Sequence, residues 1–389
     1  MQREFPDLSV TAPEVTAEEL KERIDAGESV TVLDTRRYDE FEQWHITGPT
    51  VTAVNVPFTA FLDEHGEPAE TMPEAVPEGP LVTCCAEGIS SLYVAEWLQR
   101  HGHEAEALVD GMEGWARLYE AFELPCDAAT VVQYHRPSSG CLAYMVVSEG
   151  EAAVVDPLRA FVSRYERDAL DRGAEVVAAL DTHVHADHVS GARALADLTG
   201  ADVVLPAGAV DRGLAYEAAP ETVADGDAVP VGAATVEAVA LPGHTTEMTG
   251  YRVGDLLLVG DTVFLDGVAR PDLEVGDEGA ADAARRLHRT LTELASLPDE
   301  VRIGPGHASP DAIPDPDVGL TATVMELRED LDLFVPDDRE AFVDRITTDM
   351  PPRPKNYREI IATNLGRRDV DSEEAFELEL GPNNCAVSG

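Results

Sequence analysis

The chain has 389 residues with 44% hydrophobic content, and this length favours two domains over one. Asp and Glu number 75 against 28 Lys and Arg, which gives a formal net charge of −47 at pH 7. Because affinity for nucleic acid comes from basic contacts to phosphate, this acidity argues against a nucleic-acid partner. No run of about 18 apolar residues occurs, so no membrane span is expected.

The excess of acidic residues has two explanations. High net charge with few apolar residues produces disorder, but the 44% hydrophobic content and the regular motifs below argue against it. We expect instead a folded protein adapted to very high salt, where the Debye length falls to about 3 Å and self-repulsion is screened. Such a protein loses structure when salt is removed, and circular dichroism that stays unchanged after dialysis into low salt would contradict this.

The cysteines point to a reducing compartment. Their number is odd, no C-x-x-C pair occurs, and residues 1–10 are charged and lack the apolar core of a secretory signal. These features favour a cytoplasmic protein with free thiols over a disulfide framework. The five are Cys84, Cys85, Cys126, Cys141 and Cys385.

Residues 10–122 alternate between strands and helices, which predicts a parallel α/β sheet. A turn-rich stretch, Glu123–Asp127, is interpreted as the linker to the next domain. The main elements predicted before it are strands at Ser29–Asp34 and Gly79–Cys84 and helices at Tyr38–Trp44 and Ser90–His101.

A new series of strands follows the linker and predicts two sheets with helices outside. From about Asp317 the pattern becomes helical through Glu329, with a Pro-rich break at Met350–Pro354. The predicted elements are a helix at Ala160–Arg172 and strands at Thr130–His135, Cys141–Ser148, Ala152–Asp156, Glu175–Asp181, Asp202–Pro206, Thr235–Leu241, Met248–Val253 and Leu256–Gly260.

Metal-binding residue types gather at the ends of these strands. The sequence H-V-H-A-D-H directly follows one predicted strand, and later ligand candidates come singly beside Gly or Pro. Glycine lets the backbone bring a short side chain to a common point. Five of the 11 histidines belong to this set, so a metal site is favoured over histidines scattered in loops. The candidates are His183, His185, Asp187, His188, His244, Asp261 and His307.

A second candidate site is the segment Cys85–Ser91, between a buried strand and a helix. The N–H groups and partial charge of a helix N-terminus stabilise a thiolate or persulfide anion there. The alternative is a buried structural cysteine.

The surroundings of this loop resemble the rhodanese-like domains over about Thr11–Phe122. The resemblance implies that Cys85 carries sulfane sulfur, that Cys84 is the strand end, and that the loop binds the substrate. The loop lacks the Arg or Lys often found in active sulfurtransferases and has Glu87 instead, which disfavours an anionic donor such as thiosulfate. The shared motifs are L-D-T-R at 33–36, Glu40-Phe41, H-I-T-G at 45–48, D-G-M at 110–112 and Trp115, and the substrate-binding candidates are Glu87, Gly88, Ser90 and Ser91.

The histidine pattern resembles the metallo-β-lactamase fold over roughly Asp127–Leu365. This implies an αββα sandwich at residues 127–316, with a helical extension and tail at 317–389. The same resemblance implies two neighbouring metal sites. His183, His185 and His244 form one, Asp187, His188 and His307 form the other, and Asp261 lies between them.

Three longer segments, Thr182–Gly191, Gly260–Leu273 and Pro351–Gly366, are similar to those of the persulfide dioxygenases. The resemblance implies one Fe(II) per chain in a facial triad of His183, His244 and Asp261, with open positions for a small-thiol persulfide and O₂. It also implies that Arg270 holds the substrate, for which the alternative is a salt bridge with Asp272.

Two other functions stay open. A thioester hydrolase of the glyoxalase II type uses two Zn(II) ions per chain and a metal-bound hydroxide. A carrier of sulfane sulfur needs no metal. The metal content of the purified protein separates the three functions, whereas the thiol carrier cannot be named from the sequence. Related folds suggest a homodimer by analogy.

Overall fold

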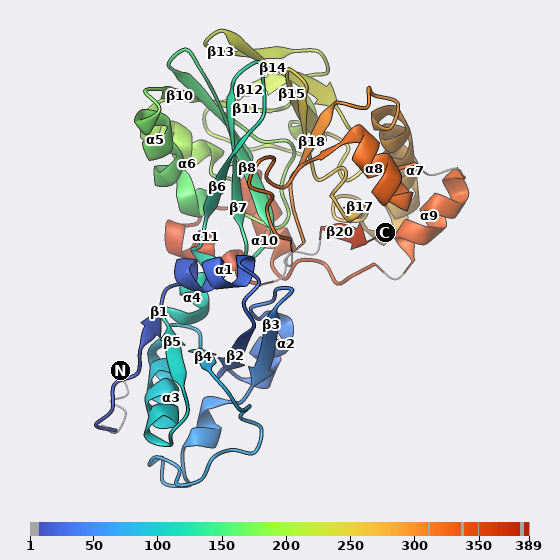
Figure 1. Ribbon diagram of the computed structural model, residues 1–389. Coiled ribbons are helices and arrows are strands. Elements are labelled where there is room, and N and C mark those ends of the chain that lie inside the picture. The colour runs from blue at the N-terminus through green and yellow to red at the C-terminus, as the bar shows by residue number, and fades with distance from the viewer. Residues whose placement is uncertain (1–7, 310–311, 336–337, 349, 382–384, 389) are drawn as a thin grey trace. The chain divides into compact units, whose positions relative to one another are not determined.

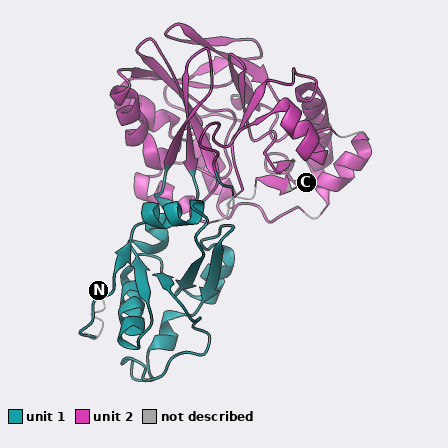
Figure 2. Ribbon diagram, in the orientation of Figure 1, with its two compact units in different colours: residues 1–119, 136–138, 310–313 teal, residues 120–135, 139–309, 314–389 magenta. Residues whose placement is uncertain are grey.

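The structure is a computed structural model that describes residues 8–309, 312–335, 338–348, 350–381 and 385–388. The chain divides into two compact units (Figure 2). Unit 1 comprises residues 1–119, 136–138 and 310–313, and unit 2 comprises residues 120–135, 139–309 and 314–389. Within the described ranges, no helix combines the length and the apolar character needed to cross a bilayer.

Unit 1 contains a five-stranded sheet in the order β1-β5-β4-β2-β3, and every neighbouring pair is parallel. This confirms the predicted parallel α/β fold. The strands are β1 (Glu14–Val15), β2 (Val30–Asp34), β3 (Val51–Asn55), β4 (Leu81–Cys84) and β5 (Ala105–Leu108), and the helices are α1 (Ala17–Asp25), α2 (Tyr38–Gln43), α3 (Ile89–Arg100) and α4 (Gly111–Ala116).

Capping hydrogen bonds and packing against the sheet stabilise the helices of unit 1. Helix α1 begins with a capping box in which Thr16 Oγ1 accepts from Glu19 N–H at 3.2 Å and Glu19 Oε2 accepts from Thr16 N–H at 3.0 Å. Helix α3 buries Trp97 and Leu98 against the sheet. Strand β4, which α3 covers, is buried along its whole length, as expected in a parallel sheet with both faces covered.

Unit 2 contains two large sheets, of seven strands in the order β12-β11-β10-β9-β8-β7-β6 and of six in the order β13-β14-β15-β16-β18-β19. Figure 1 shows α5 and α6 beside the first sheet and α7, α8 and α9 beside the second, which confirms the expected sandwich. The first sheet comprises β6 (Glu120–Leu124), β7 (Thr130–Arg136), β8 (Cys141–Ser148), β9 (Glu151–Val155), β10 (Glu175–Leu180), β11 (Asp202–Pro206) and β12 (Glu221–Val223). The second comprises β13 (Ala228–Val231), β14 (Ala234–Ala240), β15 (Thr249–Val253), β16 (Leu256–Gly260), β18 (Arg302–Pro305) and β19 (Ala322–Thr323).

The helices of unit 2 are α5 (Val162–Asp171), α6 (Ala192–Thr199), α7 (Gly276–Leu294), α8 (Val324–Asp330), α9 (Arg339–Thr347), α10 (Tyr357–Asn364) and α11 (Ser372–Leu378). Near the C-terminus, β20 (Ala386–Ser388) pairs antiparallel with β17 (Gly267–Ala269). This pairing brings the end of the described chain to the segment that follows Asp261.

One boundary differs from the sequence interpretation. The expected linker Glu123–Asp127 begins inside β6, where Glu123 pairs with Val132 and Leu124 with Val131. The residues of Glu120–Leu124 alternate between less and more exposed, which suits the edge strand of an antiparallel pair. Pro125 follows this strand directly, and this proline favoured the interpretation of Glu123–Asp127 as a turn.

Candidate functional site

The seven metal-ligand candidates all lie where strands of unit 2 end. Residues 183–188 follow β10 in the first sheet, His244 follows β14, Asp261 follows β16 and His307 follows β18. All seven side chains are buried. The two sheets therefore deliver their ligand-bearing ends to one region of the sandwich.

His183, His244 and Asp261 form one compact group. Asp261 Oδ2 lies 4.0 Å from His183 Nε2 and 3.8 Å from His244 Nε2, and each of these residues is at most 2% exposed. These three atoms are buried and have no hydrogen-bond partner among the described residues. Buried polar atoms are almost always satisfied, so three orphans facing one point indicate a bound cation.

Hydrogen bonds at Nδ1 orient the rings of both His183 and His244. His244 Nδ1 donates to the carbonyl of Arg270 at 2.8 Å. Thr182 Oγ1 donates to Asp156 Oδ2 at 2.9 Å, so the same hydroxyl oxygen accepts from His183 Nδ1 at 3.0 Å. Both rings therefore carry their proton on Nδ1 and leave the Nε2 lone pair for a metal, which is the usual arrangement around ligating histidines.

This group fits one metal ion. Metal bonds to imidazole nitrogen and carboxylate oxygen are about 2.0–2.2 Å long, so donor atoms at neighbouring positions of one ion lie about 3.0–3.5 Å apart. The separations of 3.8 and 4.0 Å are within about 1 Å of that value, so small side-chain shifts bring the three donors onto one ion. The donor set of two imidazoles and one carboxylate suits Fe(II) and Zn(II) alike.

His185 joins a different group, with Asp156 and Asp181. Its Nε2 donates to Asp156 Oδ1 at 3.0 Å, while its buried Nδ1 has no partner in the part of the chain that the structure describes. The fold resemblance implies that His185 binds a metal with His183 and His244, and the rings of His183 and His185 do lie 4.2 Å apart. Its bond to Asp156 leaves Nδ1 for a metal, as in an oriented ligand, but His185 lies outside the compact group of His183, His244 and Asp261, so its role as a ligand stays a prediction.

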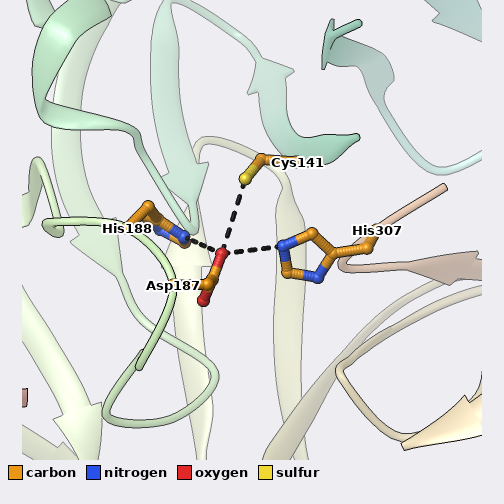
Figure 3. A group of neighbouring side chains, drawn as sticks. All are labelled: Cys141, Asp187, His188 and His307. Carbon is orange, nitrogen blue, oxygen red and sulfur yellow. Dashed lines mark hydrogen bonds and ion pairs between the residues drawn. The ribbon is translucent and has the colours of Figure 1, made fainter. Parts of the chain in front are cut away.

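Asp187, His188 and His307 come together as expected, and Cys141 joins them (Figure 3). Asp187 Oδ2 lies at their centre, 2.8 Å from His307 Nε2, 3.0 Å from His188 Nδ1 and 3.5 Å from Cys141 Sγ. His307 Nδ1 also donates to Asp261 Oδ1 at 2.5 Å, so this histidine connects the two groups.

The charged side chains of this second group shift one another's pKa values. Burial opposes protonation of His188 and His307, but nearby carboxylates outweigh it and hold the pKa of each well above its usual value. Burial also raises the pKa of Cys141, but the charge of His307 and the hydrogen bonds of His188 and His307 together outweigh it and lower that pKa to about 7. A thiol beside two imidazoles thus becomes a thiolate easily.

Cys385 forms a further group with Asp187 and Asp261. Its side chain is 2% exposed, and its carbonyl accepts from Arg270 N–H at 3.0 Å. The pairing of β20 with β17 holds it there. No motif in the sequence pointed to Cys385 or Cys141, because each stands alone among residues without ligand chemistry.

Arg270 is 1% exposed and bound by its neighbours. Its Nε and Nη2 donate to the two carboxylate oxygens of Asp272 at 2.7 and 3.1 Å, and its Nη1 donates to the carbonyl of Pro352 at 3.0 Å. The salt bridge named as the alternative to substrate binding is therefore present. Substrate binding by this side chain stays a prediction, while its carbonyl orients His244.

In unit 1, Cys85 directly follows β4 and precedes α3, which begins at Ile89. The Cys85 carbonyl accepts from Met112 N–H at 2.8 Å. Gly111 has φ +55°, and a Cβ there would lie 2.3 Å from the Cys85 oxygen, so only glycine allows this approach. The D-G-M motif is thus the support of the Cys85 loop.

The expected substrate-binding residues of this loop differ in their roles. Ser91 is buried, and its hydroxyl lies 3.4 Å from Cys85 Sγ and 3.0 Å from the carbonyl of Gly88. Gly88 caps α3 with φ +80°. Glu87 is exposed and Ser90 is half-buried, so both are accessible to a sulfur donor.

Comparison with known proteins bears on both units. Residues 16–118 match the rhodanese-like domain, and residues 137–307 match the metallo-beta-lactamase superfamily. The crystal structure of ETHE1 from Myxococcus xanthus is 28% identical with a TM-score of 0.52, over 61% of this chain and 98% of that one.

Two curated relatives are also similar to part of this chain. A beta-lactamase hydrolase-like protein of Xylella fastidiosa is 30% identical over 44% of this chain and 45% of its own length. A hydroxyacylglutathione hydrolase of Rhizobium etli is 31% identical over 45% of this chain and 60% of its own. The alignments thus span about half the length of these relatives. The chain joins a rhodanese-like domain to a metallo-beta-lactamase domain.

Proposed function

We propose that this protein oxidises the sulfane sulfur of a small-thiol persulfide to sulfite at one Fe(II) held by His183, His244 and Asp261. The observation that carries the proposal is the compact, buried group of two imidazoles and one carboxylate, each with an unpartnered donor atom. His185, the further histidine that a three-histidine zinc site needs, lies outside this compact group. Two histidines and one carboxylate are the ligands of non-haem Fe(II) oxygenases.

The reaction balances with O₂ and water. One persulfide, one O₂ and one water give one thiol and one sulfite, since O₂ and water together supply the three oxygens. The S–S bond breaks, the outer sulfur is oxidised, and O₂ is reduced. Bound Fe(II) would supply redox chemistry, which Zn(II) lacks. It would also supply open coordination positions for the persulfide and O₂.

The residues of the chain position this chemistry. Asp156 and Thr182 hold the ring of His183, and the Arg270 carbonyl holds that of His244, so both ligands are oriented before an ion binds. Burial of the group keeps bulk water from the reacting sulfur.

The rhodanese-like domain supplies or receives sulfane sulfur at Cys85 in this proposal. Its loop is formed and supported, and Ser91 lies beside the thiol. Because Glu87 takes the place of a basic residue, a neutral or protein-bound persulfide is the expected donor rather than thiosulfate.

One experiment tests the proposal directly. Iron-loaded protein in high salt is given a thiol persulfide, and oxygen uptake and sulfite are measured together. Equal amounts of O₂ consumed and sulfite formed, both lost after iron chelation, are expected. Persulfide that persists without oxygen uptake would reject the proposal.

A second candidate function is hydrolysis of a thioester by two Zn(II) ions. Asp187, His188 and His307 favour it, because they form a second group bridged to the first through His307 and Asp261. The curated relatives include a hydroxyacylglutathione hydrolase. Thioester cleavage by zinc-loaded protein without oxygen uptake, at two zinc ions per chain, is its signature. A pure sulfur carrier would contain neither metal.

A further inference from the structure

We infer that the C-terminal extension, residues 317–389, holds the metal-binding loop in its ligating shape, and that Asn364 is the residue of the extension that positions it. The metal-binding loop is defined as residues 183–190, which lie between β10 and α6 and carry four of the seven metal-ligand candidates. From the sequence, the extension is expected only as helices and a tail. Because the inference concerns the loop that carries the ligands, it holds for Fe(II) and Zn(II) alike and goes beyond the proposed oxidation.

Two N–H groups at the end of the metal-binding loop donate to side chains of the extension. Val189 N–H donates to Glu379 Oε1 and Ser190 N–H donates to Asn364 Oδ1, each at 2.9 Å. Both acceptor residues are buried, and they lie 190 and 174 residues further along the chain. Since a buried backbone N–H needs a hydrogen-bond partner, this part of the loop depends on the extension for its shape.

Asn364, the last residue of α10, uses its whole carboxamide on the loop. Its Nδ2 donates to the carbonyls of His185 at 3.0 Å and His188 at 2.8 Å, while its Oδ1 accepts from Ser190. The reverse orientation of the amide would place Oδ1 against two carbonyl oxygens, so these partners determine which way it points. The side chain is 5% exposed, so the loss of any of these bonds would leave a buried polar group unpaired.

The apolar residues of the loop pack on the extension, while its His and Asp side chains form the metal groups. Each of three loop residues shares a different buried cluster with one residue of the extension: Val184 with Leu365, Ala186 with Cys385, and Val189 with Ile360. The loop therefore lies between the metal groups on one side and the extension on the other. A shift of the extension would move the ligands with it, because packed interiors transmit displacement.

The contacts of Asn364 have a consequence for metal binding. Ligands that are held in place before an ion arrives bind it more tightly, because ordering them no longer consumes binding free energy. Groups that orient ligands from outside are typically worth about 10–100-fold in metal affinity. Asn364 holds the backbone of His185 and His188 rather than a single ring, so its loss should displace several ligands together.

Two variants of Asn364 test the inference. Asn364→Asp keeps the shape and the oxygen that accepts from Ser190, but turns lone pairs towards two carbonyls. Asn364→Leu removes all three bonds without adding charge. In both, affinity for Fe(II) and for Zn(II) should fall about 10–100-fold in titrations of the full-length protein in high salt. Hydrogen exchange of the metal-free protein, followed by mass spectrometry, should become faster in the peptide that contains Val189 and Ser190.

Thr363→Val is the matched control, because Thr363 is the preceding residue of the same helix and is fully buried. Its hydroxyl donates within the helix, to the carbonyl of Glu359 at 2.9 Å. This variant should keep wild-type metal affinity and loop exchange even where it lowers thermal stability. An equal loss of metal affinity in Thr363→Val would reduce Asn364 to a general contribution to stability and overturn the inference.

Glu379→Gln keeps the oxygen that accepts from Val189 and should bind metal like wild type, whereas Glu379→Leu should bind it more weakly. Wild-type metal affinity in both Asn364 variants would contradict the inference. One measurement is independent of the folding of any variant: in metal-free wild type, Val189 and Ser190 should exchange slowly, and exchange at the rate of an unstructured chain would also contradict it. Oxygen uptake by iron-loaded wild type tests the proposed function separately.

Discussion

The Cys85 loop of unit 1 and the metal groups of unit 2 are built in opposite ways. The loop offers one thiol, fixed by backbone contacts to the D-G-M segment. The metal groups assemble side chains from several strand ends that lie more than 100 residues apart in sequence, between His183 and His307. A function placed on one residue depends entirely on it, whereas a convergent site divides its function between ligands and the residues that orient them.

The two constructions also differ in what their neighbours contribute. Around Cys85 the supporting groups are mainly backbone, namely the Met112 N–H and Gly111, with the Ser91 hydroxyl beside the thiol. Around His183 they are Thr182 and Asp156, whose hydroxyl and carboxylate set the tautomer of the ring. Substitution of the reactive residue in unit 1 should therefore abolish its activity completely. Substitutions around the metal groups of unit 2 should instead reduce metal affinity and activity by different amounts.

The largest effect is expected from Cys85→Ser. Sulfur transfer should fall to the rate without enzyme, because the hydroxyl is a far weaker nucleophile than a thiolate. Oxygen uptake with a small-thiol persulfide should not change, since the metal groups belong to the other unit. Transfer of sulfane sulfur to cyanide and oxygen consumption are measured on the same preparation.

Cys84→Ser is the matched control for that variant. Cys84 ends β4 and is fully buried, so its loss should leave sulfur transfer in place. Full transfer activity in Cys85→Ser together with none in Cys84→Ser would show that the nucleophile is misassigned.

Asp261→Asn should have the next largest effect. The amide keeps the shape of the side chain but removes the charge that the two imidazoles share, and Asp261 also accepts from His307. Loss of an outer partner costs about 10–100-fold in metal affinity, so loss of a ligand should exceed about 100-fold. Iron content and oxygen uptake are the measurements, and Asp255→Asn, on an exposed turn, should match wild type. Wild-type iron content in Asp261→Asn would remove Asp261 from the ligand set.

Thr182→Val tests the graded response. The substitution keeps the shape but removes the hydroxyl that connects Asp156 to His183, so both tautomers of the ring become accessible. We expect iron affinity to fall about 10–100-fold, with the fold intact by circular dichroism. Thr182→Ser should restore most of the affinity, and a Thr182→Val protein that binds iron as tightly as wild type would contradict the orienting role.

The ligand-bearing strand ends could be predicted from the sequence because His and Asp beside Gly, directly after apolar runs, form a local pattern. Both fold classes followed from the alternation of strands and helices and from the motifs. Asp156 could have been found by the same rule, since it also ends a strand and precedes Pro157. The orientation of His185 towards it could not, because that depends on which of two ring nitrogens meets a carboxylate.

Cys141 and Cys385 show the other limit of sequence reasoning. Cys141 reaches His307 only through a backbone bridge between segments 166 residues apart, and Cys385 only through pairing of β20 with β17. Nothing in the residues next to either cysteine encodes those long-range pairings. The long helix α7 was also not identified, although its buried face is rich in alanine and leucine.

The smallest effect on the reaction is expected from Arg270→Lys. Lysine keeps the charge but not the two-pronged bond to Asp272 or the bond to the Pro352 carbonyl, so unfolding should become easier by about 1–3 kcal/mol. The backbone carbonyl that orients His244 remains, so KM for the persulfide should stay at its wild-type value. Thermal unfolding and steady-state kinetics separate the two roles. A large rise in KM with unchanged thermal stability would mean that the guanidinium leaves Asp272 to bind the substrate, and Arg270 would then be a substrate-binding residue rather than a support for the metal ligand His244.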